Sequence, residues 1–187
     1  MLERYFRGFL AEAEAQGRGF VLNTPTGRAS AGWGERLGWT AEQIDDVNRD
    51  AVAFARALLV RRSGPAVVNG VVGPHGDAYR PDTALTPDEA EACHHRQIAV
   101  LAGAGVDMIA AMTISTSGEA IGIAEAAPRV GVPVVLSFTL ETDGRRPGGM
   151  ALDAAIGVTD AATGGYPAAI RRGMGSIAPI PTISPRF

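Results

Sequence analysis

Apolar residues follow two patterns along the chain, one with helical spacing and one without interruption. Near the amino terminus, Leu2, Phe6 and Phe9 recur at helical spacing, which predicts an amphipathic helix over residues 2–16. Short continuous apolar runs further along the chain predict buried strands. These runs occupy residues 20–24, 66–72, 106–113 and 132–139.

Polar capping signals between these runs predict the helices that separate the strands. A threonine followed three positions later by glutamine or glutamate has the spacing of a capping box, in which each side chain bonds the other residue's backbone N–H. This spacing occurs at Thr40–Gln43, Thr86–Glu89 and Thr116–Glu119. The helices predicted from it cover about 40–61, 86–104 and 116–130, and a last helix covers about 150–162.

Strands that are apolar on both faces and alternate with helices predict an α/β fold with a parallel sheet. A doubly wound dinucleotide-binding domain is disfavoured, because no G-x-G-x-x-G follows the first strand. A barrel is favoured, because polar or turn-forming residues stand at the carboxyl ends of all four strands, where barrels carry their chemistry. Since a whole barrel takes about 250 residues, four strands make about half of a TIM-type (β/α)8 barrel.

Composition narrows the function classes. The chain has 187 residues and a net charge of −3, which gives no electrostatic reason to expect nucleic acid or an anionic membrane surface as a partner. All 17 basic residues are arginine, so a P-loop lysine and a Schiff-base lysine are both excluded. No apolar run approaches the roughly 20 residues of a membrane span. A single cysteine excludes an internal disulfide and fits the reducing cytoplasm.

The segment "GPHGDAY" follows the strand at 66–72 and carries candidate chemistry. Gly73 and Pro74 end the strand, and His75, Asp77 and Tyr79 follow as candidates for substrate contact. A phosphate cradle is disfavoured, because no helix begins directly behind the glycines. Two other interpretations stay open: a plain turn, or a barrel enzyme that uses His75 as general base together with Asp77.

Five ordered motifs resemble the homocysteine S-methyltransferase family over about residues 2–169. They are "NTPTGRAS", "GPHGDAY", "HHRQIAVLAGAGVDMIAAMT", "EAIGIAEAA" and "PVVLSFTLETDGRRPGG". The resemblance implies a (β/α)8 barrel in which zinc, held by three cysteine thiolates, activates the homocysteine sulfur for methyl transfer. This chain corresponds to barrel strands two to five.

The same resemblance implies an S-methyltransferase of methionine biosynthesis, which moves a methyl group from a small donor to homocysteine or a related thiol or selenol. Its partners are then a small-molecule thiol and a methyl donor. The strand ends that match the family motifs are the expected substrate-binding positions. They are Asn23, Thr24, Thr26, Gly73, Asp77, Thr113, Ser137 and Thr139.

The chain departs from the family pattern at the metal. The family's zinc cysteines have no counterpart here, and Cys93 lies in a predicted helix and matches no ligand position. Zinc is therefore expected for an intact family member, but the residues of this chain support no cofactor. We expect the chain to be inactive alone. The alternative is a non-catalytic remnant or pseudoenzyme that binds a small molecule.

Two further positions differ from the family. Many members have Glu-Thr at the end of the fourth barrel strand, where this chain has Met112-Thr113. Gly27 and Arg28 stand where betaine-using members place aromatic residues, which argues against an ammonium cage. Structural roles are expected for four further candidates. His94 and His95 are expected in packing or at the surface, Cys93 as a small buried hydrophobe, and Glu119 as a helix cap.

The family pattern is lost near Ala169, so we expect a partial barrel over 1–169 and a non-matching tail over 170–187. The resemblance implies truncation at both ends, because the family's first strand would precede Met1. A frameshift near Ala169 or a natural truncation with a disordered tail would explain the carboxyl end. The outer strands of a half barrel have open edges, through which the chain could form a homo-oligomer.

Overall fold

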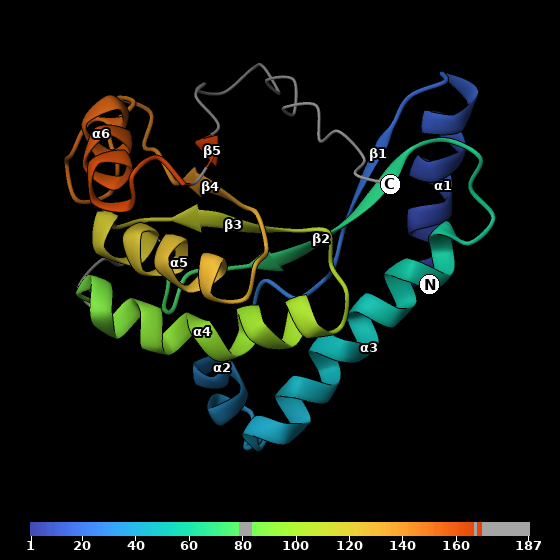
Figure 1. The fold of residues 1–187 in the computed structure, drawn as a ribbon, viewed down its shortest axis with the longest axis horizontal. Helices are drawn as coiled ribbons and strands as arrows, with labels where there is room; N and C mark the ends of the chain where they lie inside the picture. The colour runs from blue at the N-terminus through green and yellow to red at the C-terminus, as the bar shows by residue number, and fades with distance from the viewer. Residues whose placement is uncertain (79–83, 167, 170–187) are drawn as a thin grey trace.

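The computed structural model describes residues 1–78, 84–166, 168 and 169. Five parallel strands form one sheet in the order β1-β2-β3-β4-β5, so each strand pairs with its neighbours in sequence. This order is that of consecutive strands in a barrel (Figure 1). The strands are β1 (Phe20–Asn23), β2 (Ala66–Val72), β3 (Met108–Ile114), β4 (Val134–Phe138) and β5 (Ala168–Ala169).

Six helices connect or precede these strands in the described part of the chain, and α3, α4 and α5 pack against the sheet (Figure 1). Thr40 and Thr86 each form the complete capping box expected from the sequence. The helices are α1 (Leu2–Ala15), α2 (Ala31–Arg36), α3 (Ala41–Leu59), α4 (Pro87–Gly103), α5 (Ser117–Arg129) and α6 (Leu152–Thr163).

The α/β fold with a parallel sheet and alternating helices is confirmed, and two elements were not expected. Helix α2 lies where the sequence predicts a loop, because two glycines in six residues give no helical signal. Strand β5 has only two residues, too few for any periodicity to show. The predicted tail, 170–187, and Tyr79 lie outside the described residues.

The core lies between the sheet and helices α3 to α5. Val68, Val72, Leu101, Ile109 and Ile123 are fully buried there. Helices α4 and α5 approach most closely at Gly122, where a Cβ atom would come within 2.5 Å of the backbone N of Glu91 and the carbonyl O of Pro87. A glycine is therefore required at that crossing.

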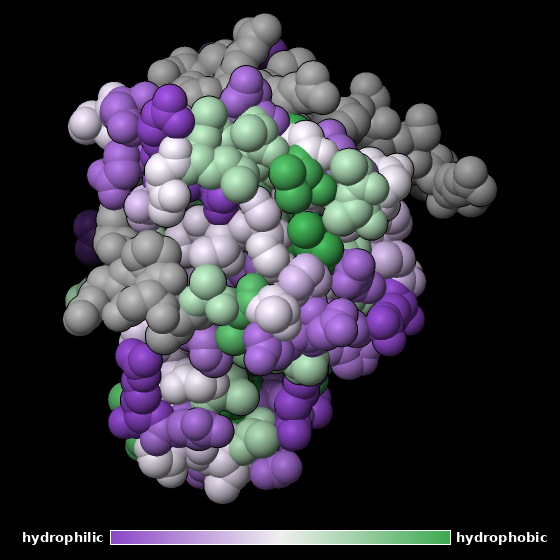
Figure 2. Space-filling model, turned by 90° about the vertical axis from the view of Figure 1, so that its left-hand side faces the viewer, coloured by the Kyte–Doolittle hydropathy of each residue, from purple (hydrophilic) through white to green (hydrophobic). Residues whose placement is uncertain are grey.

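The carboxyl ends of β1 to β4 meet at one edge of the sheet, which Figure 2 shows from outside. Hydrophobic and hydrophilic side chains are mixed on this face, and the hydrophobic ones gather on the part where α6 lies. In the described part of the chain, no helix combines the length and the apolar character needed to span a membrane.

Candidate functional site

A pocket of about 340 Å³ lies at the carboxyl edge of β1, β2 and β3. Three of the expected substrate-binding residues share it: Gly73 and Asp77 from the loop after β2, and Thr113 from β3. Carboxyl edges of parallel strands are where barrel enzymes bind their substrates. The lining is completed by Gly27, Arg28, Trp33, Val71, Pro74, Gly76, Ala78 and Met112.

Thr113 has a strained backbone at this pocket. Its φ is +61°, in the left-handed region, and no other described non-glycine residue has a positive φ. The pairing of β3 with β4 shifts register between Ala111 and Ile114, so Thr113 stands on an irregularity of the strand. Its hydroxyl donates to the carbonyl of Met112 across 2.6 Å. The strain, about 1–2 kcal/mol for a residue with a Cβ, is stored where the strand turns its side chain toward the pocket.

Gly73 forms the contact between the first two strand-end loops. A Cβ atom at this position would overlap the carbonyl oxygen of Gly27. The backbones of the β1 and β2 loops can therefore touch only because residue 73 is a glycine. This contact closes one wall of the pocket.

Two arginines lie against the ring of Trp33 at this pocket. The guanidinium carbon of Arg28 lies 4.7 Å from the Trp33 ring centroid, and that of Arg36 lies 4.4 Å from it. The face of the indole that could attract a ligand ammonium is thus already used by arginines of this chain. This geometry agrees with the expectation that an ammonium cage is absent.

The predicted threonines that follow β1 lie next to this pocket but outside its lining. Thr24 and Thr26 are buried, and their hydroxyls lie 2.7 Å apart. The hydroxyl of Thr24 accepts from the N–H of Val71 across 3.0 Å, and Thr26 donates to the carbonyl of Val71 across 2.7 Å. These bonds continue the pairing of β1 with β2 beyond the strands, so they stiffen the pocket from behind.

The remaining predicted residues lie along the same edge. Asn23 accepts a hydrogen bond at its Oδ1 from Asn69 on β2, across 2.7 Å. On β4, Ser137 is half-buried, and Thr139, directly after β4, is 7% exposed. The backbone N–H of Thr139 donates to the carbonyl of Ile114 across 2.9 Å, which extends the β3–β4 pairing. The predicted set therefore follows the edge from β1 to β4, and only part of it shares one pocket.

A buried cluster beneath the loop after β2 was not expected from the sequence. Oε1 of Glu119 accepts from the backbone N–H of His75 across 2.6 Å and lies 2.9 Å from Nε2 of His94. Nδ1 of His75 lies 3.1 Å from Sγ of Cys93. The predicted capping box at Thr116 is thus only half right, because Thr116 accepts from the N–H of Glu119 but the carboxylate turns to the two histidines. No local pattern signals contacts between residues 18–44 positions apart.

Cys93 is a protonated thiol rather than a metal ligand in this cluster. Burial, and then the negative charge of Glu119, raise the pKa of Cys93 above its usual value. A zinc ligand must be a thiolate, so both effects oppose zinc binding. In the described part of the chain no three histidine, cysteine or acidic residues stand close enough to hold a metal ion. The residues present do not fit the family's three-thiolate zinc site.

The imidazole of His75 is directed to Cys93 on α4, whereas Asp77 lines the pocket. A general base made of His75 with Asp77 stays a prediction.

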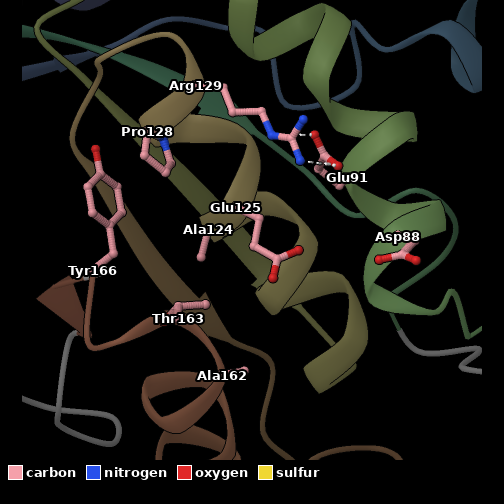
Figure 3. A pocket seen from close by; sticks show the side chains of 9 residues that line it. All are labelled: Asp88, Glu91, Ala124, Glu125, Pro128, Arg129, Ala162, Thr163 and Tyr166. Carbon is pink, nitrogen blue, oxygen red and sulfur yellow. Dashed lines mark hydrogen bonds and ion pairs between the residues drawn. The ribbon is translucent and has the colours of Figure 1, made fainter.

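A larger groove of about 540 Å³ lies on the outer face of helices α4, α5 and α6. Figure 3 shows Arg129 and Glu91 directed toward each other across it, with Nε of Arg129 3.0 Å from Oε1 of Glu91. Glu125 and Asp88 also line the groove. Since it lies on the outer helices and not on the strand ends, we place the chemistry in the smaller pocket.

Comparisons with known proteins show the family of the chain. The family model described as homocysteine S-methyltransferase matches residues 1–170. The metallated form of the Escherichia coli homocysteine methyltransferase MmuM is similar in structure, with a TM-score of 0.69, 24% identity and coverage of 80% of this chain. Its oxidized form has a TM-score of 0.67, 25% identity and the same coverage.

The chain spans 55% of the length of those two structures. The search of curated proteins finds no match. The family model covers nearly all of the described residues, and the structural matches have the same fold. The chain therefore belongs to the homocysteine S-methyltransferase family.

Proposed function

We propose that the chain carries the acceptor-binding side of an S-methyltransferase, which moves a methyl group from a small donor to the sulfur of homocysteine or a related thiol or selenol. With homocysteine as acceptor the product is methionine. We also propose that the chain does not turn over by itself, since its one cysteine cannot supply the thiolates of a zinc site.

The observation that carries this proposal is the pocket at the carboxyl edge. Gly73, Asp77 and Thr113 come from two different strand ends, yet they line one space of about 340 Å³. That volume is within the usual range for small-molecule sites. Family membership supplies the class of ligand, and the position at the strand ends supplies the place.

Each lining residue has a role in holding the acceptor. Asp77 is exposed and carries the negative charge that an amino-acid ammonium group requires. Thr113 and the Gly73–Gly27 contact fix two walls, so the ligand has one orientation. Methyl transfer needs the sulfur in line with the methyl carbon and its leaving group, and positioning of this kind accounts for much of such catalysis.

The second candidate function is a non-catalytic remnant that binds a small molecule. The half-buried Cys93 thiol favours it, because its pKa is raised and its only hydrogen-bond partner in the described chain is His75. The two candidates agree on the pocket and differ in whether it belongs to a methyl-transferring site or only binds a small molecule.

The partners we propose are the thiol and the methyl donor, without nucleic acid or membrane, and the compartment is the cytoplasm. A homo-oligomer is also proposed, because β1 and β5 end the sheet. The exposed N–H and C=O groups of an end strand are a template for pairing with a second copy. Light scattering on the purified chain should give a mass above 19.4 kDa, and a monomer at high concentration contradicts pairing.

Calorimetric titration with L-homocysteine tests acceptor binding. We expect saturable binding by the natural chain and about tenfold weaker binding by Asp77→Asn, which removes the charge of the ion pair. The matched control is Asp50→Asn, an exposed carboxylate on α3 that should bind as the natural chain does. Absence of binding would contradict the acceptor role.

Product analysis then tests whether the chain alone transfers a methyl group. The chain is incubated with homocysteine and either S-methylmethionine or glycine betaine, with and without zinc, and methionine is measured by mass spectrometry. We expect none above the level without protein. Methionine that requires the chain would contradict the proposed inactivity and exclude the remnant.

A further inference from the structure

Two buried polar side chains belong to the segment that follows β4. Arg146 is 6% exposed and Thr139 is 7% exposed. Nε of Arg146 and Oγ1 of Thr139 have no hydrogen-bond partner among the described residues. Both lie outside the lining of the 340 Å³ pocket, so the proposed acceptor site does not use them.

The guanidinium of Arg146 contacts only neutral groups. It donates to the carbonyl of Ser115 across 2.7 Å and to Sδ of Met150 across 3.0 Å. Its carbon lies 5.7 Å from the ring centroid of Phe138. No carboxylate of the described residues comes within ion-pair distance. A buried charge without a counter-charge is costly, and burial lowers the pKa of Arg146 accordingly.

Thr139 and Arg146 are anchored on adjacent carbonyls. The N–H of Thr139 donates to Ile114 and the guanidinium of Arg146 to Ser115. The next residue, Thr116, is the N-cap of the 13-residue helix α5. A helix amino terminus carries partial positive charge. The guanidinium of Arg146 and the backbone of Thr139 are therefore both held on the segment that leads into α5.

We propose that Arg146 and Thr139 form a binding site for a small carboxylate at the carboxyl end of β4. A carboxylate matches the fork of donors on a guanidinium and can also accept from a hydroxyl. It supplies the missing counter-charge. The identity of the ligand rests on the proposed function, in which both the amino-acid acceptor and donors such as betaine carry a carboxylate. The existence of the site rests only on the buried groups.

Thermal unfolding of the full chain in sodium acetate tests the site itself, with sodium chloride at equal ionic strength as reference. Acetate should raise the Tm of the natural chain and of Arg146→Lys, which keeps the charge. It should have no effect on Arg146→Met, with an affinity for acetate at least tenfold lower. The matched control is Arg145→Met, which removes the neighbouring exposed arginine and should respond as the natural chain does.

A second readout separates a ligand site from a structural arginine. Without acetate, Arg146→Met should fold with a Tm no lower than that of the natural chain, because a buried unpaired charge is replaced by an apolar side chain. A lower Tm together with no acetate effect in any variant overturns the proposal. An equal acetate effect in the natural chain and in Arg146→Met also overturns it.

Two ligand pairs identify the source of the carboxylate. L-homocysteine is compared with 3-aminopropane-1-thiol, and glycine betaine with choline, which lack the carboxylate. For each pair, the preference is the affinity for the compound with the carboxylate divided by the affinity for the compound without it. If this preference falls about tenfold in Arg146→Met for the homocysteine pair, the ligand is the acceptor, and if it falls for the betaine pair, the ligand is the donor. If homocysteine does not bind but acetate still acts through Arg146, the acceptor role is contradicted while the carboxylate site stands.

Discussion

Glu119 accepts a hydrogen bond from the backbone N–H of His75 across 2.6 Å, and this bond ties helix α5 to the loop after β2. The same oxygen lies 2.9 Å from Nε2 of the buried His94 on α4. One carboxylate thus fixes a loop and two helices at once. Since Gly73 and Asp77 belong to that loop, the bond also fixes one side of the pocket.

Replacement of Glu119 by alanine should lower the free energy of unfolding by about 2–4 kcal/mol, because two buried polar groups lose their acceptor. Glu119→Gln keeps an acceptor oxygen and should lose less than half of that. Urea unfolding measures both. Glu125→Ala, on the same helix but in the outer groove, is the control and should change stability by under about 0.5 kcal/mol. Equal losses of unfolding free energy for Glu119→Ala and Glu125→Ala would contradict the role of Glu119 in fixing the loop after β2.

Replacement of Thr113 by glycine should raise stability by about 0.5–1 kcal/mol, because glycine adopts a φ of +61° without strain. The gain is smaller than the strain itself, since glycine also makes the unfolded chain more flexible. Thr113→Ala keeps the Cβ and should give no gain. The Tm values of the natural chain, Thr113→Gly and Thr113→Ala measure this strain. A Tm of Thr113→Gly below that of the natural chain contradicts the expectation.

Replacement of Gly73 by alanine should lower stability by about 1–3 kcal/mol, because the new methyl group would overlap the carbonyl oxygen of Gly27. It should also weaken homocysteine binding, since the two loops must separate. Gly148→Ala is the control, because nothing lies within 4 Å of its Cβ position and its φ is not positive. Unfolding in urea and calorimetry give the two readouts. Tolerance of alanine at Gly73 contradicts the close contact.

The fold could be predicted largely because its signals are local. Apolar runs predicted the four longer strands, and the capping boxes at Thr40 and Thr86 predicted where α3 and α4 begin. The third predicted box failed in part, because the side chain of Glu119 found stronger use with His75 and His94. A capping pattern says only what a side chain can reach locally, not what the folded chain brings next to it.

The sequence predicted at which edge of the sheet the site lies, but not which residues share a pocket there. Strand ends indicated Gly73, Asp77 and Thr113, but the sequence does not say that these three share a pocket while Thr24 bonds the backbone behind it. Such distinctions depend on register and on the direction of each side chain. The unpaired charge of Arg146 is likewise invisible in the sequence, since its burial arises only when the segment after β4 packs against α5.

The raised pKa of Cys93 predicts how stability depends on alkaline pH. The folded chain holds the thiol proton more tightly than the unfolded chain, because burial and the charge of Glu119 disfavour the thiolate. Stability should therefore be unaffected by Cys93 below the ordinary thiol pKa, and should fall as the pH rises above it toward the folded value. Urea unfolding between pH 7 and pH 10.5 measures the slope. In Cys93→Ala this fall in stability should be smaller. In Glu119→Gln it should also be smaller than in the natural chain, because the charge of Glu119, the second cause of the raised pKa of Cys93, is removed. An alkaline slope in Cys93→Ala equal to that of the natural chain would show that other groups titrate instead.

Alkylation by iodoacetamide provides an independent check, because only the thiolate reacts. The folded chain should be modified far more slowly at pH 8 than the unfolded chain in urea at the same pH.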